Sequence, residues 1–100
     1  MDNQLPLDFQ LLKKSLLVLR ALKNKKRLKI LKLIHQKKRI TVTEIYTALK
    51  IEQSVASQQL AILRLEDFVH AKREGKQIYY SINYSRLDKV NERIVQLLEE

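Results

Sequence analysis

The sequence predicts a mainly α-helical fold with a small β-hairpin, formed as a single domain over residues 1–100. Apolar residues recur at the helical spacing of about 3.6 residues through most of the chain. After Asp67 the spacing changes to the alternation of a strand, and Gly75, the only glycine, lies inside that part, where a hairpin turn needs it. We expect the order helix, helix, short strand, helix, helix, hairpin, helix.

The first two predicted helices differ in how much of their surface is apolar. The helix over residues 7–22 carries two adjacent apolar stripes, more than one domain needs to bury, so we expect it to contact a second subunit. Asn24 is the predicted N-cap of the second helix, which turns Leu28, Leu31 and Ile34 inward. Its opposite side carries Lys25, Lys29, Lys32 and Gln36.

Local signals place the central elements. A β-branched run over residues 40–42 predicts a short strand, and Thr43 opens a third helix with Glu44 in its first turn, where a carboxylate favours the helix dipole. A tight connection then leads to a fourth helix over residues 54–66. The inward positions are Ile45, Ala48 and Leu49 in the third helix and Ala56, Leu60 and Leu63 in the fourth.

The hairpin and the last helix complete the predicted fold. Alternation indicates strands over residues 68–73 and 77–82. Because Tyr79 and Tyr80 are neighbours on a strand, one is expected to face the core and the other the surface. Ser85 is the predicted N-cap of the last helix. That helix has an apolar stripe of Leu87, Val90, Ile94, Leu97 and Leu98.

The charge is concentrated in one part of the chain. The net charge is +9, and residues 13–39 contain twelve lysines or arginines and no acidic residue, while the other residues are slightly acidic. Such a block suits a polyanion, either nucleic acid or an anionic membrane surface, although it can also be a solvated face. Two short helices with a tight turn, followed by a basic hairpin, form a layout typical of winged helix-turn-helix DNA binding.

Three segments resemble the ArsR/SmtB family of winged-helix repressors, within a similarity that covers about residues 19–84. Residues 27–31 (RLKIL) resemble the opening of the family's second helix. Residues 54–63 (SVASQQLAIL) resemble its recognition helix, and residues 73–80 (REGKQIYY) resemble its wing. The flanking helices fit the family's dimerisation helices, which implies subunit contacts by Leu12, Leu16, Leu19, Val90, Ile94 and Leu97.

The sequence departs from the family pattern at three positions. Asp67 stands where a glycine is common before the second strand, and Asp tolerates the left-handed conformation better than most residues. Gln59 replaces the usual histidine of the recognition helix. Glu52 replaces the usual capping serine, which leaves Gln53 or Ser54 to cap that helix.

We expect neither a metal site, nor a cofactor, nor an enzyme. With no cysteine, the chain has no disulfide, thiolate zinc site or iron–sulfur cluster. Asp88 and Glu92 on the last helix lack the histidine partners of a zinc site. His35 and His70 are interpreted as half-buried structural residues, and no catalytic triad or phosphate-binding glycine loop is visible.

The predicted function is sequence-specific binding of double-stranded DNA by a homodimeric transcriptional repressor in the cytoplasm, with two recognition helices about 34 Å apart in successive major grooves. The alternative is a winged-helix module that binds protein, RNA or an anionic surface. The N-terminal apolar stretch is too interrupted by charge to span a membrane, and the sequence leaves any small-molecule effector open. The candidate DNA contacts are Gln53, Ser54, Ser57, Gln58, Gln59 and Arg64 of the recognition helix, Arg73 and Lys76 of the wing, and Lys25 and Arg27.

Overall fold

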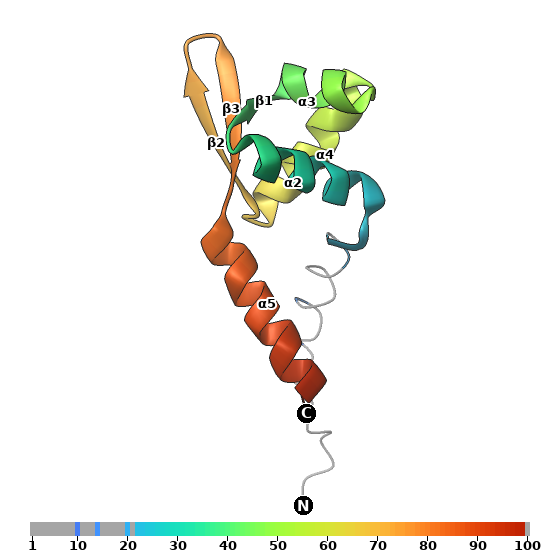
Figure 1. The fold of residues 1–100 in the computed structure, drawn as a ribbon, viewed down its shortest axis with the longest axis vertical. Coiled ribbons are helices and arrows are strands. Elements are labelled where there is room, and N and C mark those ends of the chain that lie inside the picture. Colours follow the sequence, from blue (N-terminus) through green and yellow to red (C-terminus); the bar gives the residue numbers. More distant parts are fainter. Residues whose placement is uncertain (1–9, 11–13, 15–19, 21, 100) are drawn as a thin grey trace, which may run out of the picture.

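The computed structural model describes residues 10, 14, 20 and 22–99, without the side chains of residues 97–99. Most of the helix predicted over residues 7–22, including Leu12, Leu16 and Leu19, lies outside the described residues, as does the side chain of Leu97. The order of the remaining elements confirms the prediction (Figure 1). They are α2 (Lys25–Lys37), β1 (Ile40–Thr41), α3 (Val42–Leu49), α4 (Gln53–Leu65), β2 (Val69–Glu74), β3 (Gln77–Ile82) and α5 (Tyr84–Glu99).

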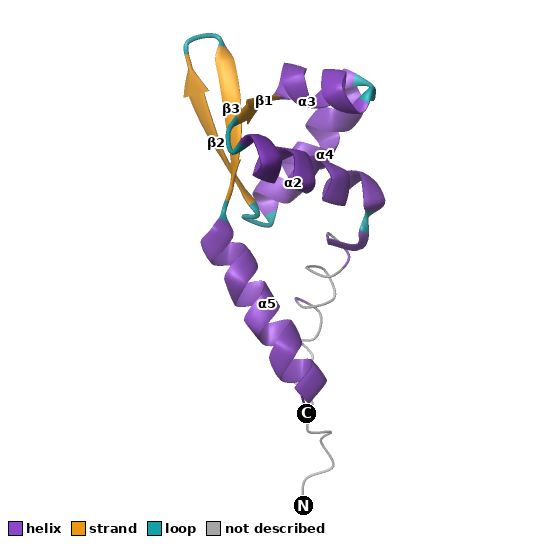
Figure 2. Ribbon diagram, in the orientation of Figure 1, coloured by secondary structure: helices purple, strands orange, loops and turns teal. Residues whose placement is uncertain are grey.

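The three strands form an antiparallel sheet in the order β1-β3-β2. β3 pairs with β2 along the whole hairpin, from Val69 opposite Ile82 to Glu74 opposite Gln77. On its other edge β3 pairs with the two residues of β1, where Ile40 lies opposite Tyr80. Figure 2 shows α2, α3 and α4 grouped beside the sheet, with the tip of the hairpin and α5 extending from this group. β3 is therefore the central strand, paired on both of its edges, while β2 lies at an edge of the sheet.

The core lies between the three central helices and the base of the sheet. Its largest fully buried side chains are Phe68, Ile30, Ile34, Ile45, Leu60 and Leu63. Each such side chain stabilises the fold by about 1.5–3 kcal/mol relative to exposure. Because α2, α3 and α4 all contribute, this core sets their relative positions.

Two predicted inward positions are wrong. Leu28 is 36% exposed, because the buried face of α2 is centred on Ile30, Leu31 and Ile34. Ala48 is exposed, while Ile45 is buried and Leu49 packs against the core. In both helices the buried arc is narrower than the apolar pattern indicated.

The cap of α2 confirms its prediction, and the cap of α3 corrects one. Asn24 caps α2, because its Oδ1 accepts hydrogen bonds from the backbone N–H groups of Lys26 and Arg27 at 3.0 and 3.2 Å. Thr41, not Thr43, opens α3: its hydroxyl accepts from the N–H of Glu44 at 3.2 Å, and the Glu44 carboxylate accepts from the Thr41 N–H.

The cap of α5 also differs from the prediction. Asn83, not Ser85, lies at its start, and its Oδ1 accepts from the N–H of Arg86 at 3.2 Å. The side-chain amide of Asn83 also donates to the carbonyl of Asp67 at 2.9 Å. One side chain therefore joins the start of α5 to the turn after α4. The predicted cap, Ser85, is already inside α5.

Candidate nucleic-acid interface

A short turn sets α4 against α3. Lys50 is left-handed, with φ 55°, and the N–H of Ile51 donates to the carbonyl of Tyr46 at 3.1 Å. α4 begins at Gln53, one residue earlier than predicted, and Glu52 is its N-cap without a side-chain cap bond. The expectation that Gln53 or Ser54 caps this helix is therefore wrong, and both side chains are exposed.

The outward surface of α4 is polar. Ala56, Leu60 and Leu63 are buried and fix one face of the helix against the core. Four predicted contact residues lie away from that face, and all of them are exposed. These are Gln53, Ser54, Ser57 and Gln58, which we call the α4 polar stripe. No side-chain hydrogen bond found in the described part of the chain engages them, so their amides and hydroxyls are available to a ligand.

Two other predicted DNA contacts, Arg27 and Gln59, are hydrogen-bonded to each other. The Arg27 Nε donates a 2.7 Å hydrogen bond to the Gln59 Oε1 across 32 residues, and both side chains are half-buried. Gln59 therefore faces α2, not outward with the α4 polar stripe. The pair joins α2 to α4 and sets the position of the recognition helix. Lys25, the first residue of α2, is exposed.

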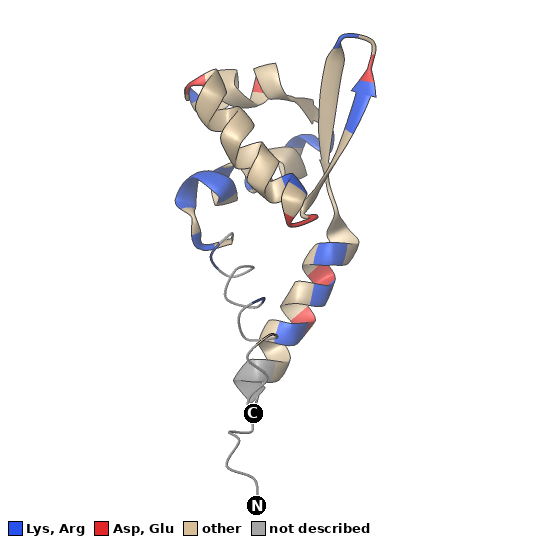
Figure 3. Ribbon diagram, turned by 180° about the vertical axis from the view of Figure 1, so that it is seen from behind, with Lys and Arg blue, Asp and Glu red and all other residues tan. Residues whose placement is uncertain are grey.

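A hollow separates α4 from the base of the sheet. It has a volume of about 520 Å³ and is lined by Ser57, Ala61, Arg64, Leu65, Asp67 and Tyr80. Asp67 is left-handed, with φ 62°, as the sequence predicted for the position where the family has glycine. Figure 3 shows α4 and the hairpin side by side on this face of the molecule. Ser57 of the α4 polar stripe and Tyr80 of the hairpin line this hollow, whereas Arg73 and Lys76 near the hairpin tip are not among its lining residues.

The wing carries its cations near the tip. Gly75, with φ 61°, makes the turn, and Arg73 and Lys76 on either side of it are exposed. The Arg73 Nε donates to the Gly75 carbonyl at 3.3 Å. Lys72 lies 3.8 Å from the Glu74 carboxylate. The wing therefore presents positive charge beyond the edge of the helical body.

Arg39, just before β1, holds the wing from the side and is a residue that sequence reasoning missed. Its guanidinium lies over the Tyr79 ring, 3.6 Å from the ring centroid, and it forms an ion pair with Glu74. Tyr80 packs against the core. The expected core position of one tyrosine is therefore confirmed for Tyr80, while Tyr79 is also half-buried and does not lie on the open surface. The signal for Arg39 was weak, because it belongs to a long run of basic residues.

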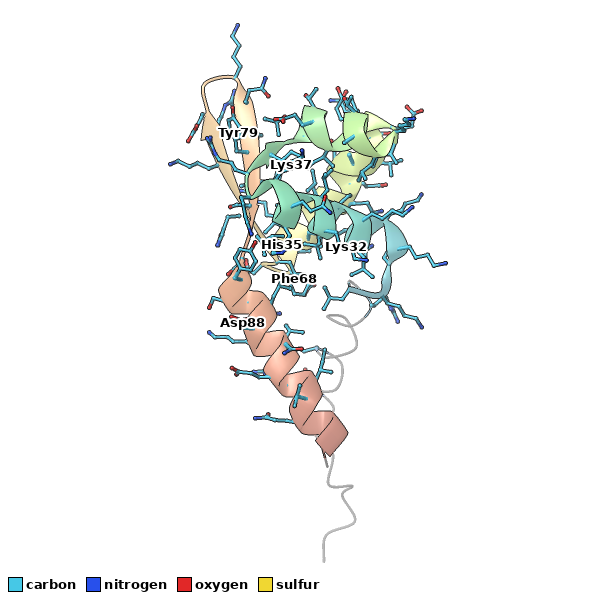
Figure 4. All side chains as sticks on the ribbon, in the orientation of Figure 1. Lys32, His35, Lys37, Phe68, Tyr79 and Asp88 are labelled. Atoms are coloured by element: carbon cyan, nitrogen blue, oxygen red, sulfur yellow. The ribbon has the colours of Figure 1, made fainter. Side chains whose placement is uncertain are left out.

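Both histidines are exposed, so the prediction of half-buried residues is wrong. His35, at the end of α2, has its Nδ1 2.7 Å from the hydroxyl of Tyr84, the first residue of α5. The two rings pack edge to face, with centroids 5.7 Å apart. Figure 4 labels His35, which lies close to the start of α5. Over the described residues, no group of three His, Asp or Glu side chains is placed to hold a metal ion. Within the same residues, none of the helices has the length and apolar character to cross a membrane.

The two predicted subunit contacts on α5 whose side chains are described, Val90 and Ile94, both pack on the chain's own core. Val90 is 6% exposed and belongs to the core, and Ile94 is half-buried and packs against that core. Val95 is 42% exposed. The apolar stripe of α5 therefore serves the chain's own core at its start, and exposed apolar surface appears further along.

Comparison with known proteins supports the resemblance to the ArsR/SmtB family that the sequence motifs indicated. A family model described as bacterial regulatory protein, arsR family, matches residues 24–71. Among solved structures, the transcriptional repressor PagR of Bacillus anthracis is 35% identical, with TM-score 0.67, over 91% of this chain and 99% of that one.

Two further structures match nearly the whole chain. NolR from Sinorhizobium fredii is 30% identical, with TM-score 0.74, over 99% of this chain and 95% of that one. The homodimeric winged helix-turn-helix DNA-binding domain of Mb0332 from Mycobacterium bovis, a possible ArsR-family regulator, is 32% identical, with TM-score 0.74, over 99% and 90%. No curated protein matches the sequence. The fold, the motifs and these similarities together establish that the chain belongs to the ArsR family of bacterial regulatory proteins.

Proposed function

We propose that the protein is a homodimeric transcriptional repressor that binds one sequence of double-stranded DNA. The observation that supports this function best is the exposed α4 polar stripe on a helix that lies beside a hairpin with exposed cations. An α-helix fits the major groove of B-DNA, and a basic hairpin fits beside it on the backbone or in the minor groove.

The α4 polar stripe carries groups suited to base edges. A Gln side chain can bond to both N6 and N7 of adenine, and Ser accepts or donates to several bases. Gln53, Ser54, Ser57 and Gln58 are assigned this role. Because α4 contains only one cation, Arg64, it contributes little general attraction to phosphate.

Affinity comes from the cations around that stripe. Arg73 and Lys76 on the wing, with Arg64 at the border of the hollow, neutralise phosphates, which positions the protein on DNA without selecting a sequence. Arg27 and Gln59 act as positioning residues, because their hydrogen bond holds α4 against α2.

Two subunits pair through the terminal helices of one domain over residues 1–100. The apolar stripes predicted over residues 7–22 support this pairing, because one domain does not need to bury both of them. Two recognition helices then enter successive major grooves about 34 Å apart. The related Mycobacterium bovis domain is described as homodimeric, and the related Bacillus anthracis protein as a repressor.

This function requires neither catalysis nor a cofactor, and its location is the cytoplasm, where DNA is accessible. The competing function is a winged-helix module for protein, RNA or an anionic surface. Selection from a pool of random-sequence duplexes separates the two. We expect one sequence to be enriched and its binding to weaken steeply as salt rises. Salt-dependent binding without enrichment of any sequence contradicts the proposal.

A further inference from the structure

We propose that α2 carries a second DNA-binding surface, which contacts the phosphate backbone of a duplex other than the one bound by α4. The surface, called here the α2 lysine stripe, consists of Lys25, Lys29 and Lys32. Lys25, a candidate contact for the duplex bound by α4, is assigned to this second surface instead. This second site for DNA goes beyond the proposed function. It rests on the proposed function only for the face of the domain on which α4 binds the first duplex.

The α2 lysine stripe lies on the opposite side of its helix from the core. Ile30, Leu31 and Ile34 are buried, and at about 100° per residue they define the inner face of α2. Lys25, Lys29 and Lys32 fall about half a turn away from the centre of that face, and all three are exposed.

This side of α2 also faces away from the recognition surface. The Arg27–Gln59 hydrogen bond shows that the inner side of α2 is turned toward α4. In Figures 1 and 4, α2 lies on the near side of the domain, where Lys32 and Lys37 are labelled. In the reverse view of Figure 3, α4 and the wing are on the near side. A straight duplex docked on α4 therefore lies across the domain from the stripe.

The charges of the stripe have no partners within the described part of the chain. α2 contains no acidic residue, and the ion pairs found among these residues, Arg39–Glu74 and Lys72–Glu74, do not involve it. Lysines at spacings of three and four residues repel one another and destabilise the helix. A surface that serves solubility alone usually intersperses both signs. The α2 lysine stripe is therefore better explained by an anionic partner.

The composition of the stripe favours a DNA backbone over the other anionic partners. Protein interfaces have an apolar centre and are depleted in lysine, whereas the stripe offers apolar surface only at Leu28 on its border. A helix that binds a membrane inserts its apolar face, but the apolar face of α2 is buried in the core. A row of lysines one helical turn apart suits a uniformly charged polymer, without selection of sequence.

A two-duplex assay tests the inference on the full chain. An immobilised duplex carrying the selected sequence is saturated with protein, and a labelled duplex of unrelated sequence is then added at several salt concentrations. The test variant is Lys29→Glu with Lys32→Glu. The matched control is Lys89→Glu with Arg93→Glu, which changes the net charge equally at exposed positions of α5. Thermal unfolding verifies that both variants fold.

We expect the wild type and the control to retain the labelled duplex. The test variant binds the immobilised duplex normally, but its binding of the labelled duplex weakens by about tenfold or more. The salt slope, which is the slope of log K against the log of the salt concentration, becomes smaller by about 2. Equal retention by the test and control variants overturns the inference, as does failure of the wild type to bind the labelled duplex. Capture of phosphatidylserine vesicles in place of the labelled duplex also overturns it.

The design separates this inference from the proposed function. If no sequence is selected, the proposed function fails, and the α2 lysine stripe is then tested by the salt slope for a single unrelated duplex. A slope that is equal in the wild type and the Lys29→Glu, Lys32→Glu variant overturns the inference by itself.

Discussion

The recognition helix and the wing are held in place by different forces and carry different chemistry. α4 is fixed by three buried side chains and by the Arg27–Gln59 bond, and its outward surface is almost uncharged. The outer half of the wing is held by strand pairing and by Arg39, and it carries cations. Groups that discriminate bases need fixed positions, whereas charges act on phosphates over several ångströms. The rigid element is therefore suited to selectivity and the more exposed one to affinity.

The largest expected effect tests the anchoring of α4. Leu60→Ala removes a side chain that is 1% exposed, and we expect it to lower the free energy of unfolding by about 2–5 kcal/mol. Leu65→Ala is the matched control on the same helix, because Leu65 is 82% exposed, and a change within about 0.5 kcal/mol is expected. Urea unfolding measures both. Equal reductions in the two variants would contradict the assigned inner face of α4.

The second effect concerns selectivity. Replacing Ser54 and Gln58 together by Ala removes two of the groups that we propose to contact bases from the α4 polar stripe. For each well-placed side chain that no longer bonds to its base, we expect discrimination between the selected duplex and a scrambled one to fall by about 1–3 kcal/mol. Fluorescence anisotropy with both duplexes measures this difference. A fall of both affinities by the same factor would contradict the proposal that Ser54 and Gln58 discriminate between bases.

The third effect concerns affinity. Replacing Arg73 and Lys76 together by Ala removes two wing cations, and binding to every duplex is expected to weaken by about tenfold, with a salt slope smaller by about 2. Discrimination between the selected and scrambled duplexes is expected to stay unchanged. Weakening confined to the selected duplex would assign sequence recognition to the wing.

The smallest effect concerns how the wing is held. Arg39→Ala removes the guanidinium from the Tyr79 ring and breaks the ion pair with Glu74. Because both interactions are exposed to solvent, removing them costs about 1 kcal/mol, and we expect a several-fold decrease in affinity for all duplexes. Tyr79→Phe keeps the ring and is expected to bind normally. Wild-type affinity in Arg39→Ala would show that the wing does not need this guanidinium.

The parts of the fold that depend on local sequence could be predicted. Apolar periodicity identified the buried face of α4, and the alternation around Gly75 identified the hairpin. Asp67 was expected to tolerate a left-handed conformation, and it adopts one. These features depend on neighbouring residues, whose spacing the sequence displays directly.

The parts that depend on long-range interactions could not be predicted. Nothing in the sequence indicates that the half-buried Arg27 side chain bonds to Gln59, 32 residues away, and its contact with DNA stays a prediction. Nothing in the sequence marks Arg39 as the partner of Tyr79, because the neighbouring basic residues carry the same charge. The cap at Asn83 is a local feature that the sequence did offer, because Asn is a favoured N-cap, but its second bond, to the Asp67 carbonyl, could not be predicted.

The central claim is that two copies of the α4 polar stripe contact one duplex in successive major grooves. Methylation interference on the selected duplex tests it most directly, because methylation of guanine N7 blocks contacts in the major groove. We predict two clusters of interfering positions about one helical turn apart, related by two-fold symmetry, which weaken in Ser54→Ala, Gln58→Ala protein. A single cluster, or interference that this variant leaves unchanged, would contradict the account.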